Sequence, residues 1–357
     1  MTLHGTARLL APLALSIAGL AQTTVNEPLD SSTAQIEAVD TPAARQTALR
    51  LLSKARAGYL LRAGTQGFDL KVTFTVDSGG QTLYDGVWKM EDQFVPGMGL
   101  RWTAQTTQAG YSVTRITAGN ATWADGTSST LPLRLHEARV ALFDSMPPAA
   151  NLGHAAIRTS TVAYNGAQLT CVLLSASAGA APGRRAEETE ECIDPQSGLL
   201  RIHSQVPGRY YVYDYAKAPR LGSRVFPRTV LVTEGGKVVS TISVDSLTDL
   251  SSADPALFVP TAAMKAKGEA VAMGSAQKLS RLFSQPAAEG SSAAPVCIFG
   301  LVTPSGELVE AHSLQPSDAN SAAALEDAKQ MNFAPQLAPG SRPQQHFVFI
   351  TERFASR

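Results

Sequence analysis

The chain has 357 residues, carries 30 Lys and Arg against 30 Asp and Glu, and is 44% hydrophobic. This length suggests two or three domains, and the zero net charge argues against nucleic-acid binding, which needs a basic face. The sequence has no run of 18 apolar residues that would span a bilayer as a helix. Its low charge and high apolar content exclude a mainly disordered protein.

The first 21 residues have the order of a secretory signal peptide. Arg8 precedes the apolar run Leu9–Ala21, and small residues occupy both positions that a signal peptidase reads. A buried helix is the alternative interpretation. Cleavage after Ala21 predicts an exported protein of the periplasm, without a transmembrane helix in the mature chain. Residues 22–40 are polar and are expected to form a disordered leader.

Residues 41–262 are predicted to form one large domain. Thr41 and Pro42 combine a capping side chain with a proline in the first turn, which is typical of a helix start. From Phe68 to Val76 apolar and polar residues alternate, which predicts a half-buried strand. Short strands separated by glycines continue to Leu247, interrupted by a helical pattern over 133–143. This spacing predicts an antiparallel meander.

Two of the three cysteines are predicted to form a disulfide. Cys171 lies in an apolar run, and Cys192 follows the acidic run Glu187–Glu191. The segment 176–185 between them is rich in Ala, Gly and Ser, so two strands joined by this loop would bring the sulfurs together in an oxidising compartment. Cys297 is expected to be a small buried residue. The acidic run predicts a solvated loop, with Ca²⁺ binding as the alternative.

The sequence predicts no catalytic, cofactor-binding or metal site. The six histidines form no metal-ligand spacing, and no GxSxG motif is present. His136 and Glu137 are predicted on the solvated face of a helix. Asp214 lies in the aromatic run Tyr210–Tyr215, which indicates a strand with cross-strand aromatic pairs more than a general base. The chain is therefore predicted not to be an enzyme.

The carboxyl-terminal third separates into two parts. Residues 263–290 are expected to be a linker, weakly helical over 276–283. Residues 291–357 predict a small α+β unit with strands at 296–303 and 308–314, a helix at 321–331 and a final strand at 345–354.

The large domain resembles the LolA/LolB-like lipoprotein-carrier family, in which a strongly curved sheet wraps helices around an apolar cavity. The resemblance spans about residues 42–260. It rests on four short matches, and Arg101 falls where such domains often carry an arginine, with a surface ion pair as the alternative. The matches are Gly86–Lys89, Leu100–Trp102, Phe226–Arg228 and Leu257–Pro260.

The last 67 residues, 291–357, resemble the TonB carboxy-terminal domain. The family's helix, its aromatic-x-Pro exit and its final Phe are matched, although Met331 replaces the usual Trp and the opening Tyr-Pro segment is missing. The resemblance implies that an extended partner peptide binds by strand addition. The chain lacks the long Pro-rich spacer of an energy transducer. The matching residues are Ala324, Leu325, Ala328, Phe333, Pro335, Gly340, Pro343 and Phe354.

Together these patterns predict an α+β protein with a large curved antiparallel sheet, packed helices and a small carboxyl-terminal α+β domain. The predicted function is that of a non-enzymatic binding or adaptor protein of the cell envelope. An apolar groove would hold a lipid or acyl chain, and the C-terminal edge strand would bind an outer-membrane or periplasmic protein. A structural scaffold without ligand and a secreted hydrolase remain the alternatives.

Overall fold

The computed structural model describes residues 36–39, 41–63, 66–80, 82–176, 183–286, 288, 295–315, 318–338 and 342–355. The predicted signal peptide, 1–21, and most of the predicted leader lie outside these residues. The end of that leader is not irregular, because Glu37–Ala38 forms strand β1 and pairs with another strand. No helix within the described part of the chain is long and apolar enough to cross a membrane.

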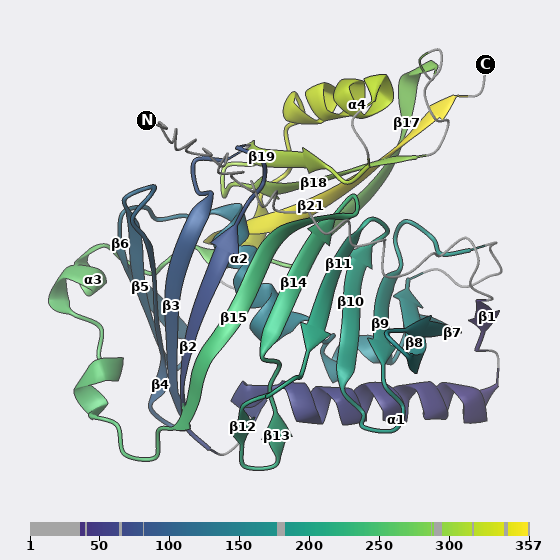
Figure 1. Cartoon of the computed structure of the whole chain (residues 1–357). Coiled ribbons are helices and arrows are strands. Elements are labelled where there is room, and N and C mark those ends of the chain that lie inside the picture. Colours follow the sequence, from purple (N-terminus) through teal and green to yellow (C-terminus); the bar gives the residue numbers. More distant parts are fainter. Residues whose placement is uncertain are drawn as a thin grey trace, which may run out of the picture.

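The predicted large antiparallel sheet is present, and the described residues supply it with 13 strands that curve around one face (Figure 1). Its spatial order is β1-β7-β8-β9-β10-β11-β14-β15-β2-β3-β4-β5-β6. The meander from β2 to β6 lies in chain order, as the glycine spacing predicts. The strands are β1 (Glu37–Ala38), β2 (Phe68–Val76), β3 (Gly86–Val95), β4 (Gly99–Thr106), β5 (Tyr111–Ala118), β6 (Ala121–Gly126), β7 (Ala156–Tyr164), β8 (Ala167–Ser175), β9 (Thr189–Ile193), β10 (Leu200–Val206), β11 (Arg209–Asp214), β14 (Thr229–Glu234) and β15 (Lys237–Asp249).

Helix α1 (Pro42–Tyr59) begins where the sequence predicts. The Thr41 hydroxyl accepts a hydrogen bond from the Ala44 N–H at 3.2 Å, and Pro42 occupies the first turn, where its missing N–H costs nothing. The helix contacts β7, β9 and β10 and crosses the end of that half of the sheet (Figure 1). It buries one apolar face, made of Ala48, Leu52, Ala55 and Tyr59.

Helix α2 (Leu133–Arg139) lies inside the curve of the sheet (Figure 1). It continues into a π-helical turn, Val140–Asp144, so the predicted helix 133–143 is confirmed with a change of pitch near its middle. All seven residues of α2 are buried. Because it is buried all round, α2 is a core helix, whereas α1 covers the core from one side.

A second sheet, with six strands among the described residues, lies across the curve of the first (Figure 1). Its central strand is β21 (Arg342–Ala355), antiparallel to β18 (Val296–Val302), which in turn pairs with β19 (Leu308–Ser313). Helix α4 (Ala319–Lys329) packs on its outer face. The predicted strands and helix of the C-terminal unit are therefore present within a few residues of their expected bounds. The short strands β16 (Ala272–Met273) and β20 (Gln336–Ala338) also pair with β21.

The linker expected at 263–290 is wrong for much of its length. Residues Gln277–Pro286 form strand β17, which pairs in parallel with β21 from Val348 to Ala355. A short helix, α3 (Ala262–Ala266), precedes it. The segment 276–283 has weak helical periodicity, and the pairing with β21 overrides that local preference.

Both sheets contribute to one hydrophobic core. One face of the second sheet carries Phe299, Leu301, Phe347 and Phe349, and these residues belong to the same cluster as the inner residues of the large sheet. The opposite face packs against α4 through a separate small cluster. A two-stranded ribbon, β12 (Arg220–Leu221) and β13 (Arg224–Val225), lies outside both sheets.

Candidate functional site: the covered concave face

The concave face of the large sheet is apolar over most of its width. Strand β2 points Phe68, Leu70, Val72, Phe74 and Val76 into the core, as its alternation predicts. Leu133, Leu135 and Leu142 of α2 and its π-helical turn fill the space in front of the sheet. The aromatic face of the second sheet then covers α2, and the ring of His136 in α2 lies 4.4 Å from the ring of Phe347.

Two polar side chains fasten this cover to the large domain. Gln345 of β21 donates from Nε2 to the Leu131 carbonyl at 2.5 Å and accepts from the Leu131 N–H at 3.0 Å. Lys278 of β17 donates to the carbonyl oxygens of Glu187 and Gln205 at 2.8 and 2.6 Å, beside β9 and β10. Burial lowers the pKa of Lys278 to about 8. The cover is thus attached through side chains and not through a shared strand ladder.

A network of four buried charges lies at the centre of the concave face. Arg134 of α2 binds both carboxylate oxygens of Glu234 at 2.7 and 2.9 Å and binds Glu137 at 2.9 Å. Arg209 of β11 binds Glu137 and Glu234 and stacks on Phe299 of the cover, 4.0 Å from the ring centroid. Burial raises the pKa of Glu234, but the attraction of Arg134 outweighs it and lowers this pKa to about 2.

This network corrects the prediction for Glu137, which was expected on a solvated helix face. Glu137 is fully buried, and His136 is 9% exposed. Burial, with repulsion from Arg139, lowers the pKa of His136 to about 3, so this histidine is neutral at physiological pH. The signal missed in the sequence is the pairing with Arg209 and Glu234, which come from strands 72 or more residues away.

The cavities around this face are small. The two best-defined pockets have volumes of about 270 and 370 Å³. The larger one lies between the cover and the β2–β3 connection and is lined by Tyr84, Val309 and Glu310. Burial raises the pKa of the Glu310 carboxyl to about 7. Pockets for drug-sized ligands occupy about 300–1,000 Å³, so the closed form has little room for a whole acyl chain.

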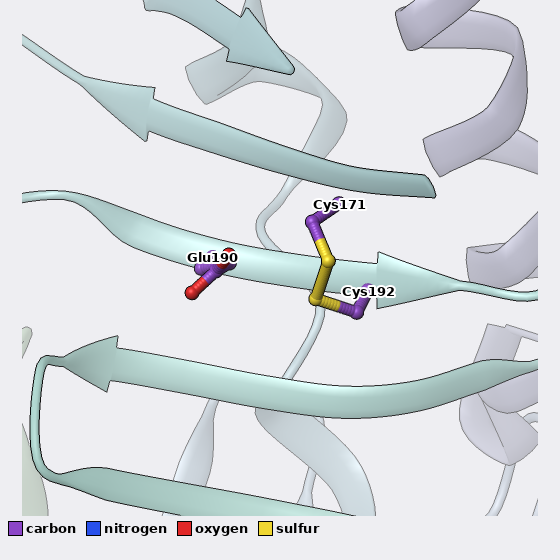
Figure 2. A group of neighbouring side chains, drawn as sticks. All are labelled: Cys171, Glu190 and Cys192. Atoms are coloured by element: carbon purple, nitrogen blue, oxygen red, sulfur yellow. A yellow bond between two sulfur atoms is a disulfide. The ribbon is translucent and has the colours of Figure 1, made fainter. Parts of the chain in front are cut away.

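The predicted disulfide is present between Cys171 and Cys192 (Figure 2). The two residues are directly opposite each other on β8 and β9, and both are fully buried. Glu190 lies close enough to form a metal-ligand group with them, but the two sulfurs are bonded to each other and are not free to bind an ion. Cys297 is free and buried, as predicted.

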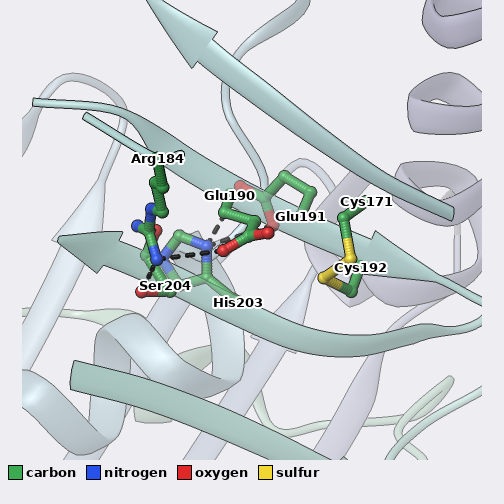
Figure 3. The surroundings of a disulfide bond; sticks show 7 residues. All are labelled: Cys171, Arg184, Glu190, Glu191, Cys192, His203 and Ser204. Carbon is green, nitrogen blue, oxygen red and sulfur yellow. Dashed lines mark hydrogen bonds and ion pairs between the residues drawn. A yellow bond between two sulfur atoms is a disulfide. The ribbon is translucent and has the colours of Figure 1, made fainter. Parts of the chain in front are cut away.

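The acidic run before Cys192 is not a solvated loop. Residues from Thr189 onward form strand β9, and Glu188, Glu190 and Glu191 are buried. Arg158 binds Glu188 at 3.0 Å, and Arg184 binds Glu190 at 3.0 Å and the Ser204 hydroxyl at 2.8 Å (Figure 3). Because arginines occupy these carboxylates, the arrangement gives no support to the Ca²⁺ alternative.

Glu191 forms a buried pair with His203, whose Nδ1 lies 3.0 Å from both carboxylate oxygens (Figure 3). Burial raises the pKa of the Glu191 carboxyl and lowers the pKa of the His203 imidazole. Both shifts favour the neutral forms. Asp214, the imagined general base, lies exposed at the end of β11, where its carboxylate accepts the Ala216 N–H at 3.0 Å.

The C-terminal strand is not the free edge that was expected. Strand β21 has β18 on one side and β17 on the other. Among the described strands, β19 pairs only with β18 and is therefore an outer strand of the second sheet. Arg101 donates to the Gln93 side chain at 3.2 Å and makes no ion pair among the described residues.

No protein-family model and no curated protein matches the chain. Among solved structures, the chain is similar to a LolA superfamily protein from Nitrosomonas europaea, with TM-score 0.37 and 10% identity over 60% of this chain and 97% of that chain. It is also similar to a putative outer membrane lipoprotein-sorting protein domain from Vibrio parahaemolyticus, with TM-score 0.38 and 8% identity over 60% and 97%. A DUF1329 family protein from Desulfovibrio piger aligns with TM-score 0.40 and 9% identity over 61% and 98%.

Proposed function

We propose that the chain is a non-enzymatic binding protein of the cell envelope that holds an apolar chain, such as a lipid or acyl group, between the large sheet and its cover. The carrying observation is the shared core, in which the aromatic face of the second sheet packs on the concave side. The cover is fastened by side chains, so it can separate without breaking a strand ladder. Burying the ligand's apolar surface would offset the cost of uncovering the concave face.

The small pocket volumes require this movement. A lipid enters only if the cover or α2 leaves the concave face. The π-helical turn after α2 supports a functional role for this segment, because single π-helical turns within helices often mark functional sites. A fully packed sheet that holds no ligand is the alternative, and it corresponds to the scaffold role.

Native mass spectrometry of the protein purified from its own envelope tests the proposal. We expect a co-purified lipid that remains bound in the intact ion and is lost on delipidation. Loosening the cover with Gln345→Ala should speed the reloading of a neutral probe, a fluorescent monoacylglycerol. Gln344→Ala is the matched control, because Gln344 is the adjacent, partly exposed glutamine on the other face of β21. Absence of any bound lipid, with no uptake of the probe by either variant, would favour the scaffold.

We further propose that the C-terminal unit docks an envelope protein by strand addition at β19 instead of β21. An outer strand offers unpaired backbone groups to an extended peptide. Val309 of β19 is 48% exposed, beside Leu83, which is 88% exposed. These side chains give an added strand apolar contacts at the open edge.

A photo-crosslinking residue at position 309, in the full chain and in its native host, tests this docking. We expect a defined adduct whose mass spectrum maps to an extended segment of one envelope protein. Val309→Lys should weaken the complex, because a charge on an edge strand opposes pairing. Val87→Lys is the matched control, since Val87 of β3 is 44% exposed. Equal complex formation by both variants would contradict docking at β19.

A further inference from the structure

The pocket of about 270 Å³ lies at the β4–β5 end of the concave face, away from the central charge network. Trp102 of β4 is the cross-strand partner of Asp92 on one side and of Arg115 on the other. Arg139, at the end of α2, lies 3.9 Å above the Trp102 ring and donates to Asp92 at 2.9 Å. Arg62, from the turn after α1, lies 4.0 Å from the Phe143 ring.

The charges of this pocket do not balance. Four arginines, Arg62, Arg115, Arg139 and Arg342, meet three carboxylates, Asp92, Asp144 and Glu269. Arg139 is paired with Asp92, and Arg342 with Glu269. Arg62 lies 3.6 Å from Asp92, which it shares with Arg139.

Arg115 has no carboxylate partner within the described part of the chain. It donates to the backbone carbonyls of Val271 at 2.9 Å and Ser129 at 3.4 Å, and its residue is only 5% exposed. Burial, with repulsion from Arg139, lowers the pKa of Arg115 to about 10, so it remains charged at neutral pH. A buried charge without a counter-ion is costly and calls for an explanation.

Several buried guanidinium nitrogens also lack acceptors. Nε and Nη2 of Arg62 and Nε of Arg115 have no hydrogen-bond partner among the described residues. Both residues line the pocket, so an anion bound there lies within reach of donors from two separate elements. Buried polar groups are rarely left unsatisfied, and an ion is one of the usual reasons when they are.

We propose that this pocket binds the phosphate group of a phosphate ester. Guanidinium groups approach from the turn after α1, from β5 and from α2, and a tetrahedral anion has enough oxygens to accept from all three. Trp102, Leu100 and Met273 provide an apolar wall for the adjoining carbon atoms. The volume accommodates a small ester or a lipid head group but not an acyl chain. This inference does not depend on the proposed apolar ligand.

Calorimetric titration and thermal unfolding of the full chain test the inference with three probes. Glycerol 3-phosphate represents a free ester, dihexanoyl phosphatidic acid represents a lipid head group, and dihexanoylglycerol lacks the phosphate. We expect at least one phosphate probe to bind and to raise Tm at constant ionic strength. Binding of both assigns a general phosphate-ester site, and binding of phosphatidic acid alone assigns a lipid head group. Dihexanoylglycerol reports separately on the apolar ligand.

Arg115→Met and Arg62→Met should each weaken phosphate binding at least tenfold. Arg62 has a side chain that is 31% exposed, so its variant keeps the test valid if Arg115→Met does not fold. Arg101→Met is the matched control, because it removes one positive charge from the neighbouring position on β4, whose side chain points to the other face. Absence of binding by either phosphate probe, or wild-type affinity in both pocket variants, would overturn the proposal.

Discussion

Buried charge is arranged differently at the two ends of the large sheet's concave side. Around β9, β11 and β14, the carboxylates of Glu188, Glu190 and Glu234 each bind an arginine at 3.0 Å or less. Around β4 and β5, Arg115 binds only backbone carbonyls. The first arrangement is complete within the protein and holds strands and α2 together. The second arrangement lacks an anion, which is why we assign a ligand to that end.

Removing one charge from the complete end should have the largest effect. Glu234→Gln leaves Arg134 and Arg209 with Glu137 as their one carboxylate, and breaking a buried ion pair from one side costs about 3–5 kcal/mol. Denaturant unfolding measures this loss. Glu326→Gln is the control, because it breaks an ion pair with Lys329 on the exposed surface of α4, where such pairs contribute about 0.5 kcal/mol or less. Equal losses in both variants would contradict the role of the network.

The same glutamate predicts a dependence of stability on pH. The pKa of Glu234 is lowered from 4.5 to about 2, so its stabilising effect is fully present above pH 4.5 and is lost as the pH falls toward 2. Unfolding curves at pH 7, 4.5 and 2.5 should show the gap between wild type and Glu234→Gln narrowing only in the lower part of this range. A gap that stays constant down to pH 2.5 would show that the Glu234 carboxylate is not held by Arg134.

The disulfide strengthens the complete end by constraining the unfolded chain. Cys171 and Cys192 are 21 residues apart in the sequence, and closing such a loop contributes about 3 kcal/mol. Cys171→Ala together with Cys192→Ala should lower the free energy of unfolding by about this amount. Reductant should lower the stability of the wild type but leave the double variant unchanged. Unchanged peptide masses on reduction of the wild type would rule out the bridge.

The attachment of the cover should have an intermediate effect. Gln345→Ala leaves the buried N–H and carbonyl of Leu131 without their partners, and an unsatisfied buried polar group costs about 1–3 kcal/mol. Amide hydrogen exchange should rise in β18 and β21 more than in β2. Gln344→Ala should leave exchange in both sheets unchanged. A uniform rise across the chain would indicate global destabilisation instead of a loosened cover.

The smallest change in stability is expected at the incomplete end. Arg115→Met removes a buried cation without a carboxylate partner, and replacing such a charge with an apolar side chain is often neutral. We expect the free energy of unfolding without ligand to change by about 1 kcal/mol or less, against about 3–5 kcal/mol for Glu234→Gln. If the Arg115 variant is destabilised as much as the Glu234 variant, the two ends do not differ as described.

The elements that could be predicted from the sequence are those with local signals. Strand β2 follows from the alternation of Phe68–Val76, and α1 follows from its cap at Thr41 and the proline after it. Strand β9 could not be predicted, because its run of glutamates resembles a solvated loop until Arg158 and Arg184 neutralise it. These arginines are close to the glutamates in the fold and are not distinguished by any motif.

Non-local pairing also explains the remaining errors. Strand β17 has no clear strand pattern and exists because β21 offers it an edge. The arginine pocket brings together residues from the turn after α1, three strands and α2, so no spacing in the sequence reveals it. The disulfide was predictable because two apolar segments flank a short loop, and this local pattern leads to adjacent strands.

The position of β21 in the chain has a consequence for the order of folding. The last 14 described residues form the central strand of the second sheet, and β16, β17, β18 and β20 all pair with it. Synthesis proceeds from the amino terminus, and earlier segments generally fold first. The large sheet can therefore form while the cover is still incomplete. During that interval the concave face is open to solvent, and it closes only after the final strand has been made.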